Sequence, residues 1–409
     1  MTPEDIAELT SPAGRVLLDS LPPYAPDLAM KLSEGLRRRG LPPRLVAAAL
    51  TQSRLRQRAE SKLGEFARTM LFTDAGLQQA TRLKVAAHHA RRYRGAGLTH
   101  VADLTCGIGV DSMTMAALGL RVTAAEVDPT TAAVARHNLH LFPSAQVIEA
   151  DGLTLDLDGL GVDAVFADPS RRTGAGRRVF NPAAYTPPLD RLLALGADRP
   201  LGLKIAPGVP HAALPPHHEA QWVSDDGTVV ECTLWAGPLA RLPGAAGRAG
   251  RSALVLSGDQ ATQLDEQPGA RLASGQLGDF LLEPDGAIVR GSLIAEAASA
   301  AGLDNPRLVH PRIAYVTADG CADTANLFAA FRVVDVIPYK VATLRAYLRA
   351  RGVGHLTIKK RGIDVDPDSL RNELRLRGEA HATAVLTRVA GRHSVIVVTP
   401  CLRQASQEH

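Results

Sequence analysis

The chain has 409 residues, of which 45% are hydrophobic and 22% are charged, and its formal net charge is +4. This length accommodates two or three domains with sizeable cores, and the mildly basic balance is compatible with a nucleic-acid partner without requiring one. The four cysteines lie far apart and form no Cys-x-x-Cys pair, which argues against a metal site or a disulfide framework and predicts a reducing, cytoplasmic location.

Residues 1–75 predict an N-terminal helical region in which proline pairs start and interrupt helices. Within it, residues 44–67 carry apolar side chains at helical spacing and basic side chains at other positions. The basic face is either solvated surface or a face that contacts phosphates, and the sequence leaves both interpretations open. A further helix is predicted over residues 78–94, with Thr81 and Lys84 as its most notable polar residues.

Four apolar segments follow, and each leads to an acidic residue at the point where a strand would end. These residues are Asp103, Glu126, Asp151 and Asp168. Because the carboxyl ends of parallel strands meet at one edge of an open α/β sheet, the four side chains are expected to line a ligand crevice there. A fifth strand and a final hairpin, over residues 201–235, complete the predicted sheet.

A turn with two glycines, Gly107 and Gly109, joins the first strand to the next helix and lets the backbone approach a ligand closely. Ser112 interrupts the G-x-G-x-x-G pattern of dinucleotide sites. The carboxylate of Asp103 would repel a pyrophosphate, but it suits the cationic amino group of S-adenosylmethionine, which carries no phosphate. The acids that end the next two strands are placed to accept from ribose hydroxyls and from an adenine amino group. We therefore expect S-adenosylmethionine as the cofactor, in preference to NAD or a purely structural turn.

The region over residues 76–240 resembles the class I S-adenosylmethionine-dependent methyltransferases in four motifs. These are D-L-T-C-G-I-G from residue 103, A-E-V-D-P from residue 125, E-A-D-G from residue 149 and D-P-S-R-R from residue 168. The resemblance implies a Rossmann-like class I methyltransferase sheet. It also implies a cofactor site formed by the following residues: Asp103, Thr105, Cys106, Gly107, Gly109, Glu126, Val127, Asp151 and Gly152.

The D-P-S-R-R segment, together with K-K-R-G-I-D-V-D-P from residue 359, resembles more narrowly the bacterial methyltransferases that carry a C-terminal THUMP-like domain. We expect this α/β domain over residues 336–409, after a connecting mixed region over residues 241–335. THUMP domains bind RNA, so the resemblance implies a methyltransferase of tRNA or rRNA. The domain is locally basic, and Lys359, Lys360 and Arg361 are expected to contact RNA phosphates; a solvated face is the alternative.

The predicted catalytic segment follows the fourth strand and consists of Asp168, Pro169, Ser170, Arg171 and Arg172. It stands where amino-methylating enzymes of the resembled class carry [DN]-P-P-[YFW], whose polar oxygens accept hydrogen bonds from an exocyclic NH2 group. Such contacts hold the nitrogen lone pair towards the sulfonium methyl group. Here Ser170 replaces the second proline and Arg171 replaces the aromatic residue, so a stacked guanidinium, or a ring from Phe180 or Tyr185, would hold the base. We predict N-methylation of an amino group on an RNA base.

Ribose 2′-O-methylation is an alternative, because Lys84, Asp168, Lys204 and Glu231 occur in the chain order of the Lys-Asp-Lys-Glu set of such enzymes. Methylation of a small molecule or a protein is another, since a transferase domain alone does not name its substrate. A non-catalytic RNA-binding protein is the least favoured reading. Carbon methylation through a cysteine is disfavoured because no cysteine lies between residues 107 and 231.

The sequence predicts no membrane partner and no bound metal. The N-terminal residues lack a signal-peptide pattern, and no apolar run reaches the roughly 18 residues of a membrane span. The oligomeric state is left open.

Overall fold

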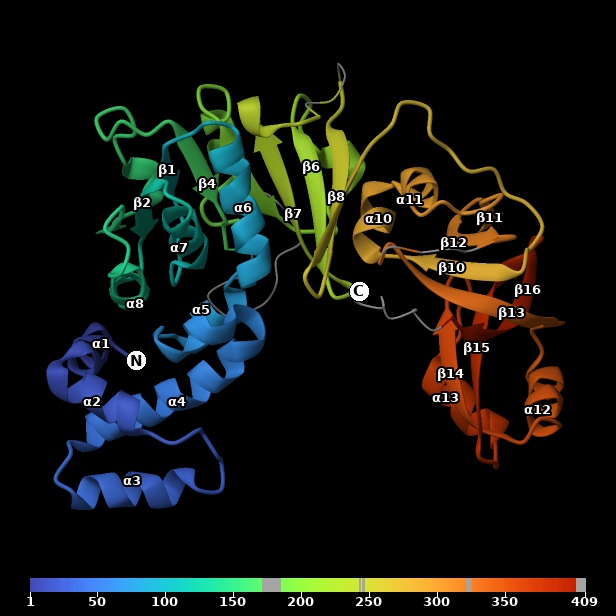
Figure 1. Ribbon diagram of the computed structural model, residues 1–409, viewed down its shortest axis with the longest axis horizontal. Helices are drawn as coiled ribbons and strands as arrows, with labels where there is room; N and C mark the ends of the chain where they lie inside the picture. The colour runs from blue at the N-terminus through green and yellow to red at the C-terminus, as the bar shows by residue number, and fades with distance from the viewer. Residues whose placement is uncertain (171–184, 243, 245–246, 321–323, 325, 402–409) are drawn as a thin grey trace, which may run out of the picture. The chain divides into compact units, whose positions relative to one another are not determined.

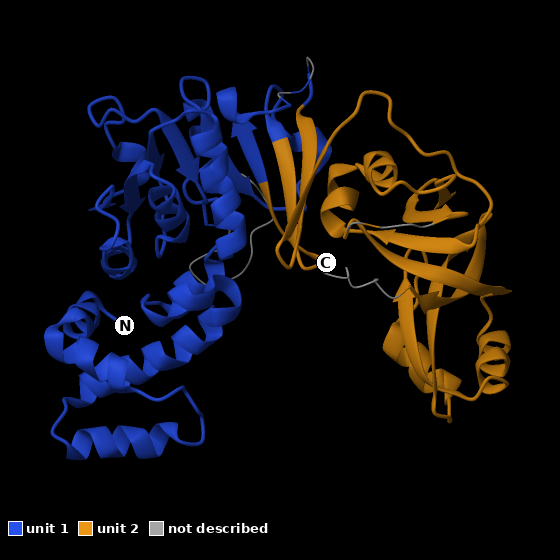
Figure 2. Cartoon of the chain, viewed as in Figure 1, with its two compact units in different colours: residues 1–219, 233–248 blue, residues 220–232, 249–409 orange. Residues whose placement is uncertain are grey.

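The chain divides into two compact units in the computed structural model, which describes residues 1–170, 185–242, 244, 247–320, 324 and 326–401. Unit 1 comprises residues 1–219 and 233–248, and unit 2 comprises residues 220–232 and 249–409 (Figure 2). The predicted helical region and most of the predicted sheet domain therefore share unit 1, whereas residues 220–232 of the latter belong to unit 2. The boundaries that the sequence placed near residues 75 and 335 both fall inside a unit.

Helices fill most of the first 95 residues (Figure 1), namely α1 (Pro3–Thr10), α2 (Pro12–Ser20), α3 (Ala29–Arg38), α4 (Pro43–Leu63), α5 (Asp74–Gln79) and α6 (Leu83–Gly95). Helix α4 ends before the predicted residue 67 because Gly64 adopts φ +55°, a left-handed conformation that favours glycine. The helix predicted over residues 78–94 is instead two helices. The ammonium group of Lys62 donates to the carbonyls of Leu77, Gln78 and Ala80, which satisfies the backbone acceptors at the end of α5.

The segment between α4 and α5 is held on both sides by amide side chains. Gln52 of α4 exchanges hydrogen bonds with the backbone of Phe72, at 2.8 and 2.9 Å. Asn138 of α8 (Pro129–Leu139) does the same with the backbone of Leu71, and its amide also donates to the carbonyl of Ile108 at 2.8 Å. The N-terminal helices are thereby joined to the glycine turn after the first strand.

The sheet of unit 1 has the strand order β3-β2-β1-β4-β5-β7. Its strands are β1 (His100–Asp103), β2 (Arg121–Glu126), β3 (Ala145–Glu149), β4 (Ala164–Ala167), β5 (Leu201–Ile205) and β7 (Thr228–Ala236), the last of which crosses the unit boundary. Strands β1 to β5 pair in parallel. The order reverses between β1 and β4, the position at which open α/β sheets bind ligands. This arrangement confirms the predicted Rossmann-like class of fold.

Close packing fixes α6 against the sheet. Gly202 of β5 has no side chain, and a Cβ there would lie 2.5 Å from the Tyr93 hydroxyl and 2.6 Å from the Trp235 ring. The Tyr93 hydroxyl donates to the carbonyl of Val165 at 2.6 Å. Helix α7 (Val110–Ala117) packs beside α6 (Figure 1). One continuous core joins the N-terminal helices to these elements.

Unit 2 contains β8 (Gly250–Ser257), β9 (Gln260–Asp265) and all but the first residue of β6 (Glu219–Asp225). It also contains a separate seven-stranded sheet with the order β11-β12-β10-β13-β16-β15-β14. That sheet comprises β10 (Phe280–Pro284), β11 (Arg307–His310), β12 (Ile313–Ala318), β13 (Phe328–Pro338), β14 (Val353–Lys360), β15 (Ala380–Val389) and β16 (Arg392–Pro400). The helices of unit 2 are α10 (Gly286–Gly291), α11 (Ile294–Ala300), α12 (Val341–Arg349) and α13 (Pro367–Leu374). The remaining helix, α9 (Leu189–Leu195), belongs to unit 1. From α12 onward the chain contains both helices and strands, in keeping with the α/β domain that the sequence predicts over residues 336–409.

Candidate active site

The turn between β1 and α7 has the shape expected of a ligand-binding loop. Gly107 and Gly109 adopt φ +54° and +86°, values that side chains with a Cβ rarely take. A Cβ at Gly107 would meet no atom within 4 Å, so the turn borders open space there. A Cβ at Gly109 would lie 3.3 Å from Leu139, so this second glycine also allows close packing on α8.

Asp103 lies beneath this turn and is only 1% exposed. Its carboxylate accepts from the Ser112 hydroxyl at 2.6 Å and from the Thr105 backbone N–H at 3.3 Å. Burial raises the pKa of Asp103 to about 7, although the Ser112 hydrogen bond opposes the shift. The side chain therefore stabilises the turn through hydrogen bonds from Ser112 and Thr105, a role that its place in the sequence did not predict.

Glu126 ends β2 and reaches back to the same turn. Its two oxygens accept from the backbone N–H groups of Gly107, at 3.1 Å, and Asp128, at 2.8 Å. Burial raises the pKa of Glu126 above its ordinary value. Val127, the next residue, is 70% exposed.

Asp151 and Gly152 follow β3. The Asp151 carboxylate accepts from the backbone N–H of Leu153 at 3.0 Å and caps a short 3-10 turn, and its side chain is exposed. Gly152 is required by a close backbone approach, because a Cβ would lie 2.3 Å from the carbonyl oxygen of Leu104. The structure thus brings the ends of β1, β2 and β3 together at one edge of the sheet.

Asp168 completes this edge at the end of β4. Its backbone N–H donates to the hydroxyl of Thr105 at 2.6 Å, so the glycine turn and the catalytic segment are directly joined. Its carboxylate side chain is 29% exposed and pairs through Oδ2 with the Lys204 ammonium at 2.5 Å. Within the described residues, Oδ1 has no hydrogen-bond partner.

Lys204 belongs to β5 and is itself buried, with an exposed fraction of 7%. It also donates to the Thr81 hydroxyl at 2.8 Å. That hydroxyl donates to Asp111 of α7 at 2.5 Å, and the other Asp111 oxygen lies 2.8 Å from Nδ1 of His89. The sequence had marked Thr81 as a notable residue but missed Asp111 and His89. The available signal was an acidic residue in the first turn of the helix that follows the glycine turn.

The remaining predicted residues have varied surroundings. Pro169 is buried, and Ser170 pairs with the backbone of Thr186. Arg171, Arg172 and Phe180 lie outside the described residues. Tyr185 is buried and accepts from the backbone N–H of Ala206, so its ring is not presented to a base.

The thiol of Cys106 is also buried, and burial raises its pKa well above the ordinary value, which disfavours the nucleophilic thiolate. Lys84 is exposed on α6, and Glu231 is buried in the part of β7 that belongs to unit 2. Of the Lys-Asp-Lys-Glu set, Asp168 and Lys204 are in contact.

In the basic segment at the end of β14, two of the three cationic side chains contact other residues of unit 2. Lys359 pairs with Glu283 at 2.6 Å, and Arg361 lies 3.6 Å from the same carboxylate while donating to the carbonyl of Ala314. Lys360 between them is exposed. Two of the three predicted RNA contacts therefore have intramolecular partners in unit 2.

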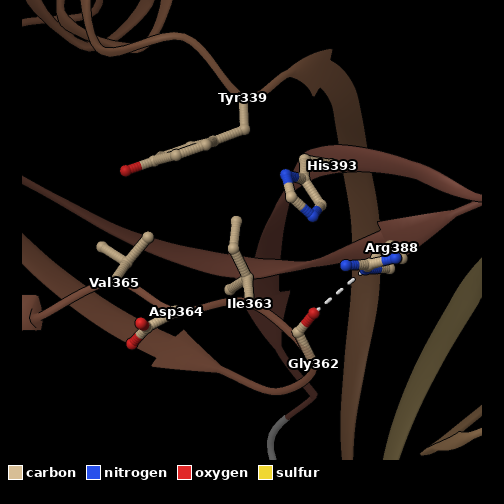
Figure 3. Close-up of a pocket in the computed structure, with 7 residues that line it drawn as sticks. All are labelled: Tyr339, Gly362, Ile363, Asp364, Val365, Arg388 and His393. Carbon is tan, nitrogen blue, oxygen red and sulfur yellow. Dashed lines mark hydrogen bonds between the residues drawn. The ribbon is translucent and has the colours of Figure 1, made fainter.

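A hollow of about 450 Å³ lies beside this segment in unit 2 (Figure 3). It is lined by Tyr339, Gly362, Ile363, Asp364, Val365, Arg388 and His393. Arg388 donates to the carbonyl of Gly362 at 3.2 Å, which holds its guanidinium group along one wall. An aromatic ring, an imidazole and a guanidinium group thus border one depression.

Within the described part of the chain, no helix has the length and apolar character needed to cross a membrane. Over the same residues, no group of three or more His, Cys, Asp or Glu side chains is arranged to hold a metal ion. The edge formed by β1 to β4 offers carboxylate oxygens, an exposed apolar side chain at Val127 and the open turn at Gly107. These groups fit the amino, hydroxyl and adenine parts of the expected S-adenosylmethionine.

The chain is similar to known proteins over most of its length. Rv3037c of Mycobacterium tuberculosis strain H37Rv, named as an uncharacterized S-adenosylmethionine-dependent methyltransferase, is 36% identical over 361 residues, covering 85% of this chain and 94% of that protein. Its counterpart in strain CDC 1551, MT3122, matches equally well. Residues 328–400 match the THUMP domain-like family, and residues 2–59 match a domain of unknown function, DUF8688.

A solved structure has the same fold. A candidate methyltransferase from Porphyromonas gingivalis W83 superposes with a TM-score of 0.70 over 92% of this chain and 98% of its own, at 20% identity. The long match to the mycobacterial relatives carries the assignment of the family, and the fold agrees with it. The chain belongs to the S-adenosylmethionine-dependent methyltransferases, uses S-adenosylmethionine, and carries a THUMP-like domain at its C-terminal end.

Proposed function

We propose that the protein methylates an amino group of an RNA base and that Asp168 accepts the hydrogen bond that orients this group. The observation that carries the proposal is the state of the Asp168 carboxylate. It lies at the end of β4, partly exposed, with Oδ2 paired to Lys204 and Oδ1 without a partner among the described residues. An available carboxylate oxygen can accept a hydrogen bond from an amino N–H group.

The chemistry that S-adenosylmethionine supplies is an electrophilic methyl group on sulfur. The lone pair of the amino nitrogen forms the new N–C bond while the C–S bond breaks and its electrons remain on sulfur. The nitrogen then releases one proton. By accepting from an N–H of the amino group, Oδ1 of Asp168 would orient the nitrogen lone pair towards the methyl group, and the same oxygen could take the departing proton.

For the cofactor, we propose that Glu126 and Asp151 accept from ribose hydroxyls and from the adenine amino group, with the ring against Val127. Thr105, Cys106, Gly107, Gly109 and Gly152 form the backbone of this pocket. We assign Asp103 a supporting role, because its buried carboxylate holds the turn from below.

The THUMP-like domain supports RNA as the substrate. Lys360 is exposed at the end of β14, and the hollow beside it presents Tyr339, Arg388 and His393 (Figure 3). Aromatic and guanidinium groups stack on unpaired bases, and cations pair with phosphates. We propose this hollow and Lys360 as the RNA-contacting part of unit 2, with Lys359 and Arg361 in supporting positions.

Transfer to a ribose 2′-hydroxyl is the second candidate function, favoured by the 2.5 Å contact between Lys204 and Asp168. A lysine and a carboxylate in contact can orient and deprotonate a hydroxyl. The same lysine also holds Asp168 in the first candidate. Replacement of Lys204 is therefore expected to slow either reaction, and the product must distinguish them.

The deciding experiment incubates the purified protein and isotopically methyl-labelled S-adenosylmethionine with total RNA and, in parallel, with extracted protein and small molecules, all from a strain that lacks the gene. Nucleosides are then released and fragmented in a mass spectrometer. We expect the added mass on a base fragment. Label on the ribose fragment would favour the second candidate. Label that enters extracted protein or small molecules and never RNA would contradict both.

A further inference from the structure

We propose that Thr81 and Asp111 are positioning residues, which hold the Lys204 ammonium group against Asp168 and so fix the orientation of the catalytic carboxylate. The inference deepens the proposed function, since it rests on Asp168 as the group that meets the substrate. It assigns a role to two residues that lie in the buried interior of unit 1, away from the open side of the turn.

The hydrogen bonds of this group have a fixed direction. An ionised carboxylate only accepts, so the single hydrogen of the Thr81 hydroxyl must point to Asp111 Oδ2, 2.5 Å away. The hydroxyl lone pairs are then left to accept from the Lys204 ammonium at 2.8 Å. Asp111 thus acts on Lys204 through Thr81, and Lys204 in turn acts on Asp168.

The position of Asp111 is itself fixed. Nδ1 of His89 donates to its Oδ1 at 2.8 Å, so both carboxylate oxygens have donors. Burial alone would raise the pKa of Asp111, but the His89 hydrogen bond and the nearby Lys204 charge bring it below its ordinary value. Asp111 therefore keeps the negative charge that attracts the Lys204 ammonium.

Burial makes this arrangement selective for one geometry. Thr81, Asp111 and Lys204 are each only 7% exposed. A buried ammonium or carboxylate is strongly destabilised when its hydrogen bonds are not made, so alternative side-chain positions are disfavoured. Four segments meet here: the link between α5 and α6, helix α7, strand β5 and the end of β4. The carboxylate of Asp168 is consequently held by a rigid scaffold rather than by its own loop.

Rigidity of this kind matters for methyl transfer. With Oδ2 bound to Lys204, rotation of the Asp168 carboxylate is restricted and Oδ1 faces the substrate in one direction. A misplacement of about 1 Å in such a group can slow a reaction about a hundredfold. The inferred effect of losing Thr81 is therefore on the chemical step and not on the binding of the methyl donor.

The test compares Thr81→Val, which removes the hydroxyl at nearly constant volume, with Thr81→Ser, which retains it. Thr123→Val is the matched control, because Thr123 of β2 is also a buried threonine whose hydroxyl has two side-chain partners, His100 and Gln146. The protein is labelled with 15N at the lysine side-chain nitrogens, of which the chain has seven. The Lys204 signal is identified by its loss in Lys204→Arg.

We expect a slowly exchanging Lys204 ammonium signal in the wild type, in Thr81→Ser and in Thr123→Val. Exchange with water should be at least about tenfold faster in Thr81→Val, because the buried hydrogen bond is lost. Asp111→Asn should shift the same signal and provides a second variant if Thr81→Val does not fold. An unchanged signal in both Thr81→Val and Asp111→Asn would overturn the proposal.

The functional arm measures single-turnover transfer to the RNA used above, together with donor affinity by calorimetry. We expect the rate to fall about 10- to 100-fold in Thr81→Val with donor affinity unchanged, and Thr81→Ser to restore most of the rate. Equal losses in Thr81→Val and Thr123→Val would reduce Thr81 to a structural role and contradict the proposal. If the wild type methylates no RNA, the proposed substrate fails while the ammonium signals still decide the positioning role.

Discussion

Two polar clusters of the molecule behave differently although the sequence marks both. At the carboxyl ends of β1 to β4, acids that are far apart in the chain lie at one edge of a sheet, joined by hydrogen bonds such as that from Asp168 to Thr105. At the end of β14, three consecutive cations do not act together. Lys359 and Arg361 contact Glu283, and only Lys360 is exposed.

The difference lies in what determines the direction of a side chain. In a parallel sheet, the position of a residue at a strand end is fixed by topology, so four strand ends must converge. In a run of cations on a strand, successive side chains point to opposite faces, and the count of charges says nothing about which face is buried. Strand topology is therefore a better predictor of a site than local charge.

The largest expected effect is the loss of methyl-donor binding when the open turn after β1 is blocked. Gly107→Arg should abolish methyl-donor binding in calorimetry, because the new side chain enters the open space beside the turn. Gly119→Arg is the control, since Gly119 has a similar positive φ, +87°, and open surroundings at the far end of α7. Both variants carry the same kind of backbone strain. Comparable loss of donor affinity in the two would show that strain, and not the site, is responsible.

The second effect concerns the chemical step. Asp168→Ala should slow methyl transfer about 100- to 1,000-fold, the usual cost of removing one group that stabilises a transition state, with donor affinity largely retained. Asp168→Asn keeps an oxygen acceptor and should lose less. Single-turnover rates at saturating donor measure both. Identical losses would mean that the negative charge, rather than the acceptor, is essential.

The third effect is a dependence of stability on pH. Burial raises the pKa of Asp103 to about 7, so between about pH 4 and pH 7 the native state retains a proton that the unfolded chain has released. The free energy of unfolding should therefore fall as pH rises through this window, by at most about 1.4 kcal/mol per pH unit. Urea unfolding at pH 5 and pH 8 should show a flatter dependence in Asp103→Asn. Ser112→Ala removes a hydrogen bond that lowers this pKa and should extend the fall to higher pH.

The smallest effects distinguish the paired cations of unit 2, Lys359 and Arg361, from the exposed cation Lys360. Glu283→Ala leaves Lys359 and Arg361 without their shared carboxylate and should lower the free energy of unfolding by about 1–2 kcal/mol. Lys360→Glu should change it by less than about 0.5 kcal/mol, yet weaken RNA binding and reduce its salt dependence. Urea unfolding and RNA titrations at two salt concentrations separate the roles. Loss of stability in Lys360→Glu without loss of RNA affinity would reverse the assignment.

Much of the fold was predictable because periodicity and strand ends are local signals. The parallel strands of unit 1 end next to the acids that the sequence marks, and helices and strands both occur in the predicted α/β domain over residues 336–409. The single helix expected over residues 78–94 was wrong because Lys62, distant in the chain, satisfies the carbonyls that end α5. No local pattern contains that information.

The site, like the fold, was predictable only where local sequence patterns determine it. Acids at strand ends were identified as a group, but their individual roles depend on contacts across the fold. Asp103 was expected at the cofactor site, and the structure places it buried beneath the glycine turn. Asp111 and His89 belong to no recognisable motif. Asp111 is linked to the site only by hydrogen bonds through Thr81 and Lys204, which belong to other segments of the chain.

The amide clamp formed by Gln52 and Asn138 around residues 71 and 72 has a thermodynamic consequence. The clamp and the continuous core tie α1 to α4 to the glycine turn, so these helices cannot unfold while the sheet keeps its packing. Unit 1 should therefore melt as one cooperative transition. Although residues 2–59 match a family of their own, we expect them not to fold independently, because their buried side chains belong to the same core cluster as those of the sheet.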